Sequence, residues 1–465
     1  MTNQSDKSDD AGYRLDRVPY GKFHKRLLTL IGAGMFLDGF ELYIAGGVLA
    51  SLVNTKFSTM AENAGFVTAT FLGMVIGAWS AGILGDRYGR KFTFQINLLI
   101  FGLASVGAFF APNINVLIGL RFIMGLGLGA EVVCSFAMLS EFVPSSVRGR
   151  MIGWLALLTN VPLLITGFLS VWVIPTLGWQ YMFLFGGVGA LIVWYARKGL
   201  PESPRWLQSK GRYREAEEIL VRIEQEAGVT YKRGVSPTAD VAAPKSVSVW
   251  ALFSRPIRGR VLLGMFLHTV VNLCFYGFIG WLPTFLLKQG ATITASLTWT
   301  TVMAIGAPVG ALIGIGISDR LGRKPGIIGA CLVAACFGGL LPYVGDGYIL
   351  LFIGFCLFSA IYVLHAVGYA LYVPELFPTE YRLRGMGLCS STARLVTAAV
   401  QYGVVALFAF GGIAAIVGSL NVLLLLLALF VAMFGVETMR RPLEEIASDP
   451  GDSDVLVAPA LSSQS

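Results

Sequence analysis

Long apolar runs recur along almost the whole of this 465-residue chain, separated by short polar and basic segments. A helix needs about 20 apolar residues to cross the hydrocarbon core of a bilayer. Backbone groups in lipid must be hydrogen-bonded within the protein, so continuous runs predict helices, whereas the strands of a β-barrel alternate apolar and polar residues. Only 13% of the residues are charged, about half the share in a soluble protein. We therefore expect an all-α integral membrane protein.

The apolar runs predict twelve spans, six in each half of the chain. They lie near 27–50, 66–84, 92–111, 115–139, 151–173, 180–198, 261–287, 297–317, 326–345, 348–373, 386–409 and 412–436. The predicted domains are an N-terminal tail (1–26), a six-helix bundle (27–198), a central loop (199–258), a second bundle (259–438) and a C-terminal tail (439–465). An amphipathic helix is expected near 212–227. Residues 1–17 and the C-terminal tail are expected to be disordered.

The net charge of +8 does not indicate a nucleic-acid partner, because the basic residues lie in short segments between the apolar runs. Lys22, Lys25 and Arg26 directly precede the first span, which predicts a cytoplasmic N-terminus, and an even number of spans returns the C-terminus to the same side. We expect a multi-pass protein of the plasma membrane, the inner membrane in a Gram-negative bacterium. The six cysteines lack metal-binding or disulfide spacing, so packing roles and no metal site are expected.

Two motifs occur twice at one spacing. GDRYGRK at 85–91 returns as SDRLGRK at 318–324, and EFVPSSVRGR from Glu141 returns as ELFPTEYRLRG from Glu375. The offsets are 233 (319 − 86) and 234 (375 − 141), and each is close to half the chain length. This predicts duplication of a six-helix unit, with the two bundles as repeats and a solute site between them.

These motifs resemble those of the major facilitator superfamily. GDRYGRK and SDRLGRK are similar to its loop signatures after helices two and eight, and PELFPTEYRLRG (374–385) to the signature after helix ten. RFIMGLGLG (121–129) resembles the helix-four signature, and PESPRWL (201–207) the sugar-porter motif after helix six. The resemblance covers essentially the whole chain. It implies two pseudo-symmetric six-helix bundles and transport of a small molecule by alternating access.

Within the superfamily, LDGFE (37–41), LGLGAEV (126–132) and NLCFYGFIGWLPTFL (272–286) resemble the proton symporters of aromatic acids and related metabolites, including nicotinate-type carriers. The glutamine-rich helix-seven motif of sugar porters is missing from the sequence, and Gln180 in GWQYMF replaces their expected arginine. Helix five also lacks the Gly-Pro signature of drug–proton antiporters. These departures favour an organic acid over a hexose or a drug.

Ionisable residues inside the spans are candidates for proton coupling, because burying a charge in a membrane is costly. Asp38 and Glu41 share one face of helix one. Counting the helical rise brings Arg121 of helix four within reach of Glu41, so we expect these two to form a pair. Related porters use such a pair in proton coupling. Glu131 is expected at the depth of Asp38, and two carboxylates at one level would suit a proton carrier.

The second half offers candidates for binding the solute. Arg394 and His365 are each expected about 15 Å from the cytoplasmic face, where a guanidinium could bind a substrate carboxylate. His268 is a further candidate nearer the cytoplasmic end of helix seven. Other polar and aromatic residues that could line the cavity are Asn272, Tyr276, Trp281, Tyr362, Tyr369 and Gln401.

The charged loop motifs are expected to form gates. In the resembling family such contacts join the two halves on the cytoplasmic side and break when the protein opens inward. Glu141 with Arg148, and Glu375 with Arg382, are expected to form matching clasps. The other residues assigned to the gates are Asp86, Arg87, Arg90, Asp319, Arg320 and Arg323.

The hypothesis is a monomeric, proton-coupled symporter of a small organic acid with no cofactor and with the lipid bilayer as its surroundings. A sugar or polyol symporter remains the alternative, favoured by PESPRWL, and an exporter of toxic compounds is a third. A non-transporting receptor is disfavoured, because it would not need both gating motifs and midplane charges. The sequence contains no arrangement of nucleophile and base that would indicate an enzyme.

Overall fold

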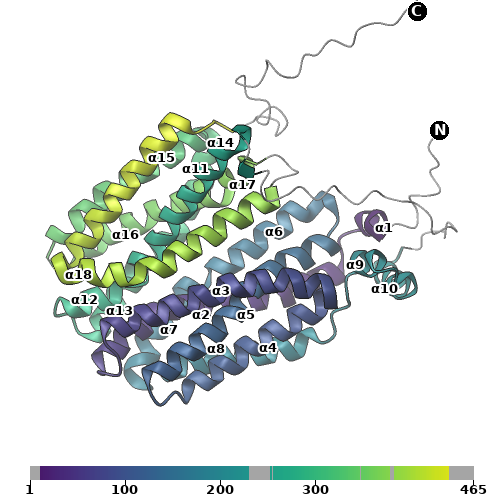
Figure 1. The fold of residues 1–465 in the computed structure, drawn as a ribbon, viewed down its shortest axis with the longest axis horizontal. Helices are drawn as coiled ribbons and strands as arrows, with labels where there is room; N and C mark the ends of the chain where they lie inside the picture. Colours follow the sequence, from purple (N-terminus) through teal and green to yellow (C-terminus); the bar gives the residue numbers. More distant parts are fainter. Residues whose placement is uncertain (1–10, 230–251, 254, 346, 378–381, 439–465) are drawn as a thin grey trace, which may run out of the picture. The chain divides into compact units, whose positions relative to one another are not determined.

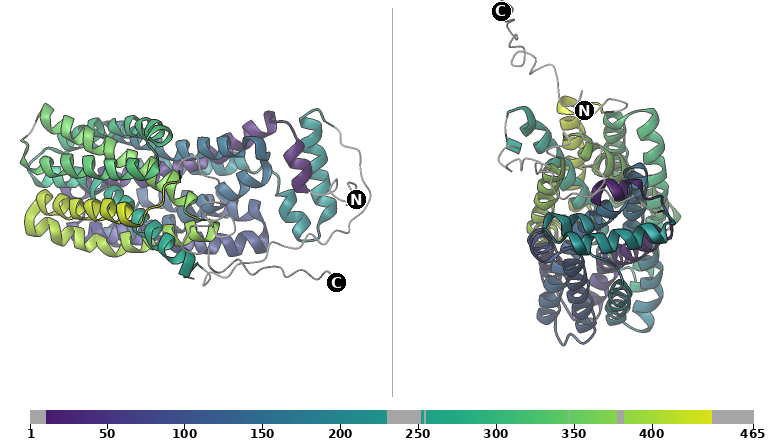
Figure 2. Two further views of the ribbon diagram at one scale, coloured as in Figure 1. Left: turned by 90° about the horizontal axis from the view of Figure 1, so that it is seen from above. Right: turned by 90° about the vertical axis from the view of Figure 1, so that its right-hand side faces the viewer.

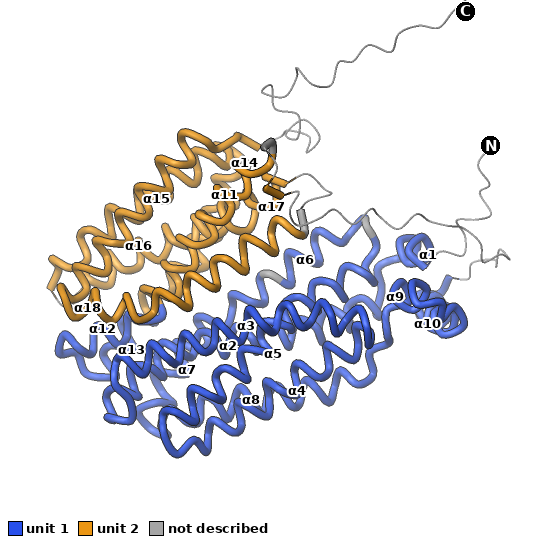
Figure 3. Tube along the Cα trace, viewed as in Figure 1, with its two compact units in different colours: residues 1–242, 280–301 blue, residues 243–279, 302–465 orange. Residues whose placement is uncertain are grey.

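The computed structural model describes residues 11–229, 252–253, 255–345, 347–377 and 382–438. Every element in these residues is helical. The chain divides into two compact units (Figure 3), of which unit 1 comprises residues 1–242 and 280–301, and unit 2 comprises residues 243–279 and 302–465.

Unit 1 contains the six membrane spans of the first half, the fifth of which consists of α6 and α7, and three short helices (Figure 1). Their bounds are α1 (Ala11–Arg17), α2 (Lys22–Asn54), α3 (Met60–Tyr88), α4 (Arg90–Phe109), α5 (Ile114–Phe142), α6 (Ser145–Asn160), α7 (Pro162–Thr176), α8 (Gln180–Arg197), α9 (Pro204–Ser209) and α10 (Tyr213–Glu226). The unit also includes α12 (Leu282–Lys288) and most of α13 (Ile293–Ala304).

Unit 2 contains the remaining helices, two of which include π-helical segments. Their bounds are α11 (Arg255–Asn272), η2 (Leu273–Ile279), α14 (Gly306–Arg320), α15 (Arg323–Leu340), η3 (Leu341–Tyr343), α16 (Tyr348–Leu364), η4 (His365–Tyr372), α17 (Val373–Glu375) and α18 (Arg382–Phe434). The segments η2 and η4 are π-helical, and η3 is a short 3₁₀ turn.

The prediction of twelve membrane helices is confirmed. In the described residues, ten continuous helical stretches are long and apolar enough to cross a membrane. One of them, α18, is two helices joined at Gly411 and Gly412, whose backbone angles are not helical. The helix α8, with 18 residues, occupies the sixth predicted span. The break in α18 falls between the last two predicted spans.

Helix starts follow from local capping. The first residue of α3 is Met60 because Thr59 and Glu62 form a capping box, in which each side chain accepts a hydrogen bond from the other residue's backbone N–H. Asn113 caps α5 by accepting a hydrogen bond from Val116. Both helices therefore begin before the apolar runs that predicted them.

The prediction that residues up to 17 are disordered is wrong for 11–17. These residues form α1, and its Arg14 is buried by contacts about 200 residues away along the chain. Arg14 donates hydrogen bonds to both carboxylate oxygens of Glu224 (2.7 and 2.9 Å) and to Glu217 (2.5 Å). Burial opposes its charge, but the two carboxylates outweigh burial and raise the pKa of Arg14. The helix therefore lies against α9 and α10 at one end of unit 1 (Figure 2).

The expected amphipathic helix is present as α10, with Ala216, Leu220 and Ile223 buried. Most of the central loop after α10, and the C-terminal tail, lie outside the described residues. The segment 280–301, predicted in the second bundle, groups with unit 1 because α12 packs on α2. Gly46 of α2 permits this approach, since a Cβ there would lie 3.1 Å from the carbonyl oxygen of Gly280.

The helices α3 and α5 pack with their backbones in contact. A Cβ atom on Gly77 of α3 would collide with the carbonyl oxygen of Leu126, and one on Gly129 of α5 would collide with that of Met74. The glycines of RFIMGLGLG therefore bring α5, with Arg121 and Glu131, against α3.

We expect Gly129→Val to destabilise the protein, because overpacking at a tight contact costs about 1–3 kcal/mol. Gly119→Val is the matched control, since it lies on the same helix and a Cβ there meets nothing within 4 Å. The measurement is the melting temperature of both variants in detergent. Equal melting temperatures would contradict backbone contact between α3 and α5.

Candidate functional site

The centre of unit 1 contains a buried ion pair between Glu41 on α2 and Arg121 on α5. Their N–O distance is 2.8 Å, and the side chains are 0% and 1% exposed. Arg121 also donates to Thr70 (3.2 Å) and lies 4.5 Å from the ring centre of Phe66. Ser105 is 3.4 Å from the second oxygen of Glu41. The contact expected from the helical rise is present, and its role in proton coupling stays a prediction.

A small residue on α8 provides room for this pair. A Cβ on Gly186 would lie 2.7 Å from the second carboxylate oxygen of Glu41. Asp38, one turn before Glu41 on α2, is also buried, with 2% of its surface exposed. Residues from five helices therefore surround one carboxylate–guanidinium pair with a second carboxylate one turn away.

A second buried ion pair lies between Glu131 on α5 and Arg197 at the end of α8. The N–O distance is 2.6 Å. Arg197 donates two further hydrogen bonds, to the carbonyl oxygens of Leu30 (2.8 Å) and Ile31 (2.9 Å), and stacks on Phe94 at 3.9 Å. Glu131 was expected to act with Asp38, and the structure gives it an arginine partner instead. Arg197 was missed, although it lies within the predicted span 180–198.

The charged loop motif of unit 1 forms a network at the start of α4. Arg90 pairs with Asp86 (2.8 Å) and with Glu141 (3.1 Å). Glu202, from the PESPRWL motif, accepts hydrogen bonds from the backbone N–H groups of Arg90 (3.0 Å) and Lys91 (3.1 Å). A carboxylate here interacts favourably with the positive end of the helix dipole of α4.

The clasp predicted between Glu141 and Arg148 is wrong. Glu141 pairs with Arg90, and Arg148 donates to Asp16 (3.1 Å) and to the carbonyl oxygen of Val143. The partner of Arg148 therefore comes from α1, a segment that was expected from the sequence to be disordered.

The same network occurs in unit 2. Arg323 forms a bidentate pair with Glu375 (3.1 Å for both contacts), and Glu437 accepts from the backbone N–H groups of Arg323 (2.9 Å) and Lys324 (3.0 Å). Glu437 corresponds to Glu202 at an offset of 235 (437 − 202), close to that of the repeated motifs. The duplication therefore includes a capping carboxylate that the sequence analysis missed.

The other predicted gate residues make no contact with these two networks in the described parts of the chain. Arg87 lies over the ring of Tyr88 at 5.4 Å, and Arg320 is exposed. The side chains of Asp319 and Arg382 lie outside the described residues, so the predicted pairing of Glu375 with Arg382 is not tested, and Glu375 has Arg323 as its partner.

Unit 2 contains a cluster of aromatic rings on its two π-helical segments and the adjoining helices. The ring centres of His268 and Tyr369 are 4.1 Å apart, and those of His365 and Tyr369 are 4.9 Å apart with nearly parallel planes. Phe275 lies 5.3 Å from His365 and 4.9 Å from Tyr362. We call these five residues the aromatic cluster. Single π-helical turns are frequent at functional sites.

The other expected solute ligands are placed differently. Arg394 is partly exposed on α18, close enough to His268 for their charges to interact. Asn272 donates to the carbonyl oxygen of His268 (2.9 Å), and Tyr276 adjoins Phe275 in η2. Gln401 is buried and donates to Thr397 of its own helix. Trp281 is fully buried beside Phe285 and belongs to unit 1, whereas the aromatic cluster belongs to unit 2.

Comparison with known proteins identifies relatives along the whole chain. A family model described as "Sugar (and other) transporter" matches residues 27–449. An inner membrane metabolite transport protein of Escherichia coli (YdjE) is 35% identical over 94% of this chain and 98% of its own. The niacin transporter NiaP of Acinetobacter baylyi is 33% identical over 93% and 98%. The crystal structure of a D-xylose–proton symporter has a similar fold, with a TM-score of 0.67 at 19% identity, covering 90% of this chain and 99% of that one.

We expect Glu202→Ala to lower stability by about 1 kcal/mol, because it leaves the first N–H groups of α4 without a cap. Glu202→Gln, which keeps an acceptor, should cost less. Burial raises the pKa of Glu202 in spite of its hydrogen bonds from Ser203, Lys91 and Arg90.

The raised pKa fixes the sign of the pH dependence. The stability that Glu202 contributes relative to glutamine is fully present below its ordinary pKa and is lost as the pH rises through the raised value. Melting temperatures of wild type and Glu202→Gln between pH 4 and pH 8 test this. A wild-type advantage that grows with pH would contradict it.

Proposed function

Because this chain belongs to the family of sugar and other transporters in the major facilitator superfamily, we propose that it imports a small aromatic carboxylate together with protons. The family consists of multi-pass membrane transporters of small molecules, and its members are not enzymes. The proposal adds the coupling ion, the direction and the chemical class of the solute.

The buried pair of Glu41 and Arg121 is the observation on which proton coupling rests. A carboxylate and a guanidinium removed from water are tolerated only as a pair, so adding a proton to Glu41 leaves Arg121 with an uncompensated charge. Protonation therefore changes which arrangement of α2 and α5 is stable. A pair of this kind can couple proton binding to a conformational change.

The distribution of carboxylates supports the same assignment. The twelve predicted spans contain only three carboxylates, Asp38, Glu41 and Glu131, and all three are in the first half. The spans of the second half contain none. A proton that crosses the membrane region on a carboxylate must therefore use these residues. Glu41 and Glu131 each pair with an arginine, but only Glu41 has a second carboxylate, Asp38, one turn away on the same helix, so we propose Glu41 and Asp38 as the carriers.

The aromatic cluster and Arg394 support an aromatic acid as the solute. Aromatic faces stack on planar rings, and an arginine binds a carboxylate through two hydrogen bonds. Both features lie in unit 2. The niacin transporter, at 33% identity, carries by its name a solute of this chemical class.

We expect Glu41→Gln to abolish accumulation of labelled niacin in proteoliposomes with a proton gradient, because glutamine cannot release a proton. Exchange of niacin between the two sides should persist, since it needs no net proton movement. Glu215→Gln is the control, because Glu215 is an exposed residue of α10. If Glu41→Gln accumulates niacin at the wild-type level, or if accumulation by wild type persists with a protonophore, the proposal of proton coupling is contradicted.

We expect wild-type protein to bind niacin more tightly than its neutral amide. In Arg394→Gln the ratio of these two affinities should fall at least about tenfold, because charge-assisted hydrogen bonds are worth about 1.5–3 kcal/mol. Competition binding on purified protein measures both ligands, with D-xylose as a third. An unchanged preference in Arg394→Gln would contradict the role of Arg394. Displacement of niacin by D-xylose at comparable concentrations would favour the sugar symporter instead.

A further inference from the structure

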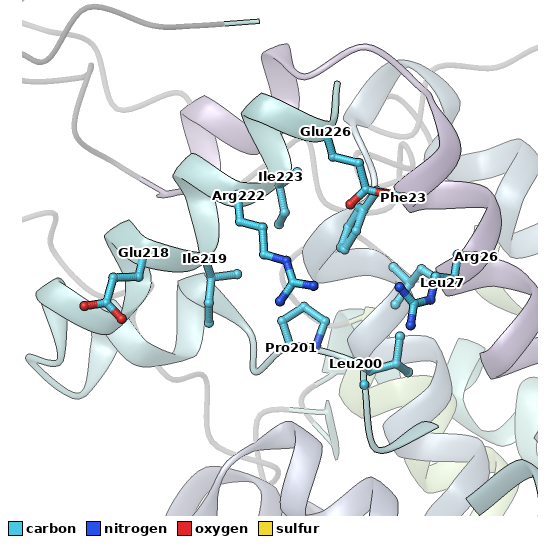
Figure 4. A pocket seen from close by; sticks show the side chains of 11 residues that line it. Phe23, Arg26, Leu27, Leu200, Pro201, Glu218, Ile219, Arg222, Ile223 and Glu226 are labelled. Carbon is cyan, nitrogen blue, oxygen red and sulfur yellow. The ribbon is translucent and has the colours of Figure 1, made fainter. Parts of the chain in front are cut away.

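Unit 1 contains a pocket that is lined by none of the residues assigned to transport. It has a volume of about 260 Å³, near the lower end of the range for small-molecule sites. Its walls come from the start of α2, the segment that follows α8, and one face of α10 (Figure 4). The apolar part of the lining includes Phe23, Leu27, Leu200, Ile219 and Ile223.

Two arginines point into this pocket from opposite walls. Arg26 of α2 and Arg222 of α10 direct their guanidinium groups toward the space above Pro201 (Figure 4). Neither of them forms an ion pair with any side chain in the described parts of the chain. Two glutamates also line the pocket: Glu218, which is paired with Arg214 on its own helix at 3.4 Å, and Glu226. Two guanidinium groups that share one opening without a carboxylate partner favour an anion.

The pocket lies at the level expected for lipid headgroups. Trp194 and Tyr195, at the end of α8, are aromatic residues of the kind that is enriched at the membrane–water interface, and Lys198 lies 4.1 Å from the ring of Trp194. The pocket begins at the next residue, Gly199. With Lys22 and Lys25 beside Arg26, five basic residues gather at this end, a number typical of sites for anionic lipids.

We propose that this pocket binds the phosphate headgroup of an anionic phospholipid from the adjacent leaflet. Arg26 and Arg222 bind the phosphate, and the apolar lining receives the first carbons of the glycerol and acyl groups. A lipid bound in this way bridges α10 to the membrane ends of α2 and α8. Lipid binding at this pocket does not depend on which solute is transported or on proton coupling.

The test compares lipid binding by purified full-length protein in detergent, measured by titration under native mass spectrometry. The ligands are phosphatidylglycerol, phosphatidylcholine with the same acyl chains, and glycerol 3-phosphate as a soluble headgroup. The variant is Arg26→Gln with Arg222→Gln. The control, Lys210→Gln with Arg150→Gln, removes the same charge from two exposed residues outside the pocket.

We expect wild type and control to prefer phosphatidylglycerol over phosphatidylcholine. The pocket variant should bind phosphatidylglycerol about thirtyfold more weakly, because it lacks two cations that attract an anionic headgroup. Arg222→Gln alone should weaken binding about fivefold by the same reasoning. Wild-type affinity in the pocket variant, or an equal loss in the control, would overturn the proposal. Binding of glycerol 3-phosphate with the same dependence on both arginines would overturn the choice of a lipid.

Discussion

A charge buried inside a membrane protein must have a partner, and this requirement determines how unit 1 is built. Among its described residues two arginines are fully buried, Arg121 and Arg197, and each has a carboxylate, further hydrogen-bond acceptors and an aromatic ring. Removing one partner from a buried pair is strongly destabilising, since it leaves an uncompensated charge. The pairs therefore hold α2 against α5 and α8 in one register, and the glycines at the α3–α5 contact make that register sterically accessible.

The same requirement applies where helices end. The first N–H groups of α4 and α15 have no partner within their own helices, and in both units a glutamate from a distant segment accepts from two of them. The sequences around these glutamates differ, PESP at 201–204 and VETM at 436–439, yet both place a carboxylate at the same point of the repeat. The duplicated feature is thus the contact of a glutamate with the start of a helix, and the repeated sequence motifs include only the helix side of this contact.

The sequence predicted features whose geometry is local or can be counted along one helix. Twelve spans follow from the length of the apolar runs, and the contact of Glu41 with Arg121 follows from the rise per residue in helices that run without a break. The partners of Arg14, Arg197 and Arg148 could not be found in this way. Each lies between 66 and 210 residues away, and choosing it requires knowing which helices are neighbours. The expected clasp of Glu141 failed because it assumed a partner seven residues away.

The two halves descend from one repeat but have diverged in their chemistry. The spans of the first half have kept three carboxylates, and those of the second have none. In their place the second half has a cluster of aromatic rings on its two π-helical segments and the adjoining helices, and an arginine, Arg394, whose side chain is partly exposed. A carboxylate can exchange a proton, and a ring beside a guanidinium can hold an aromatic anion. In the function that we propose, this division separates the group that responds to protons from the groups that recognise the solute, so either can change in evolution while the other is retained. Such independence is what a family that transports many metabolites through one fold requires.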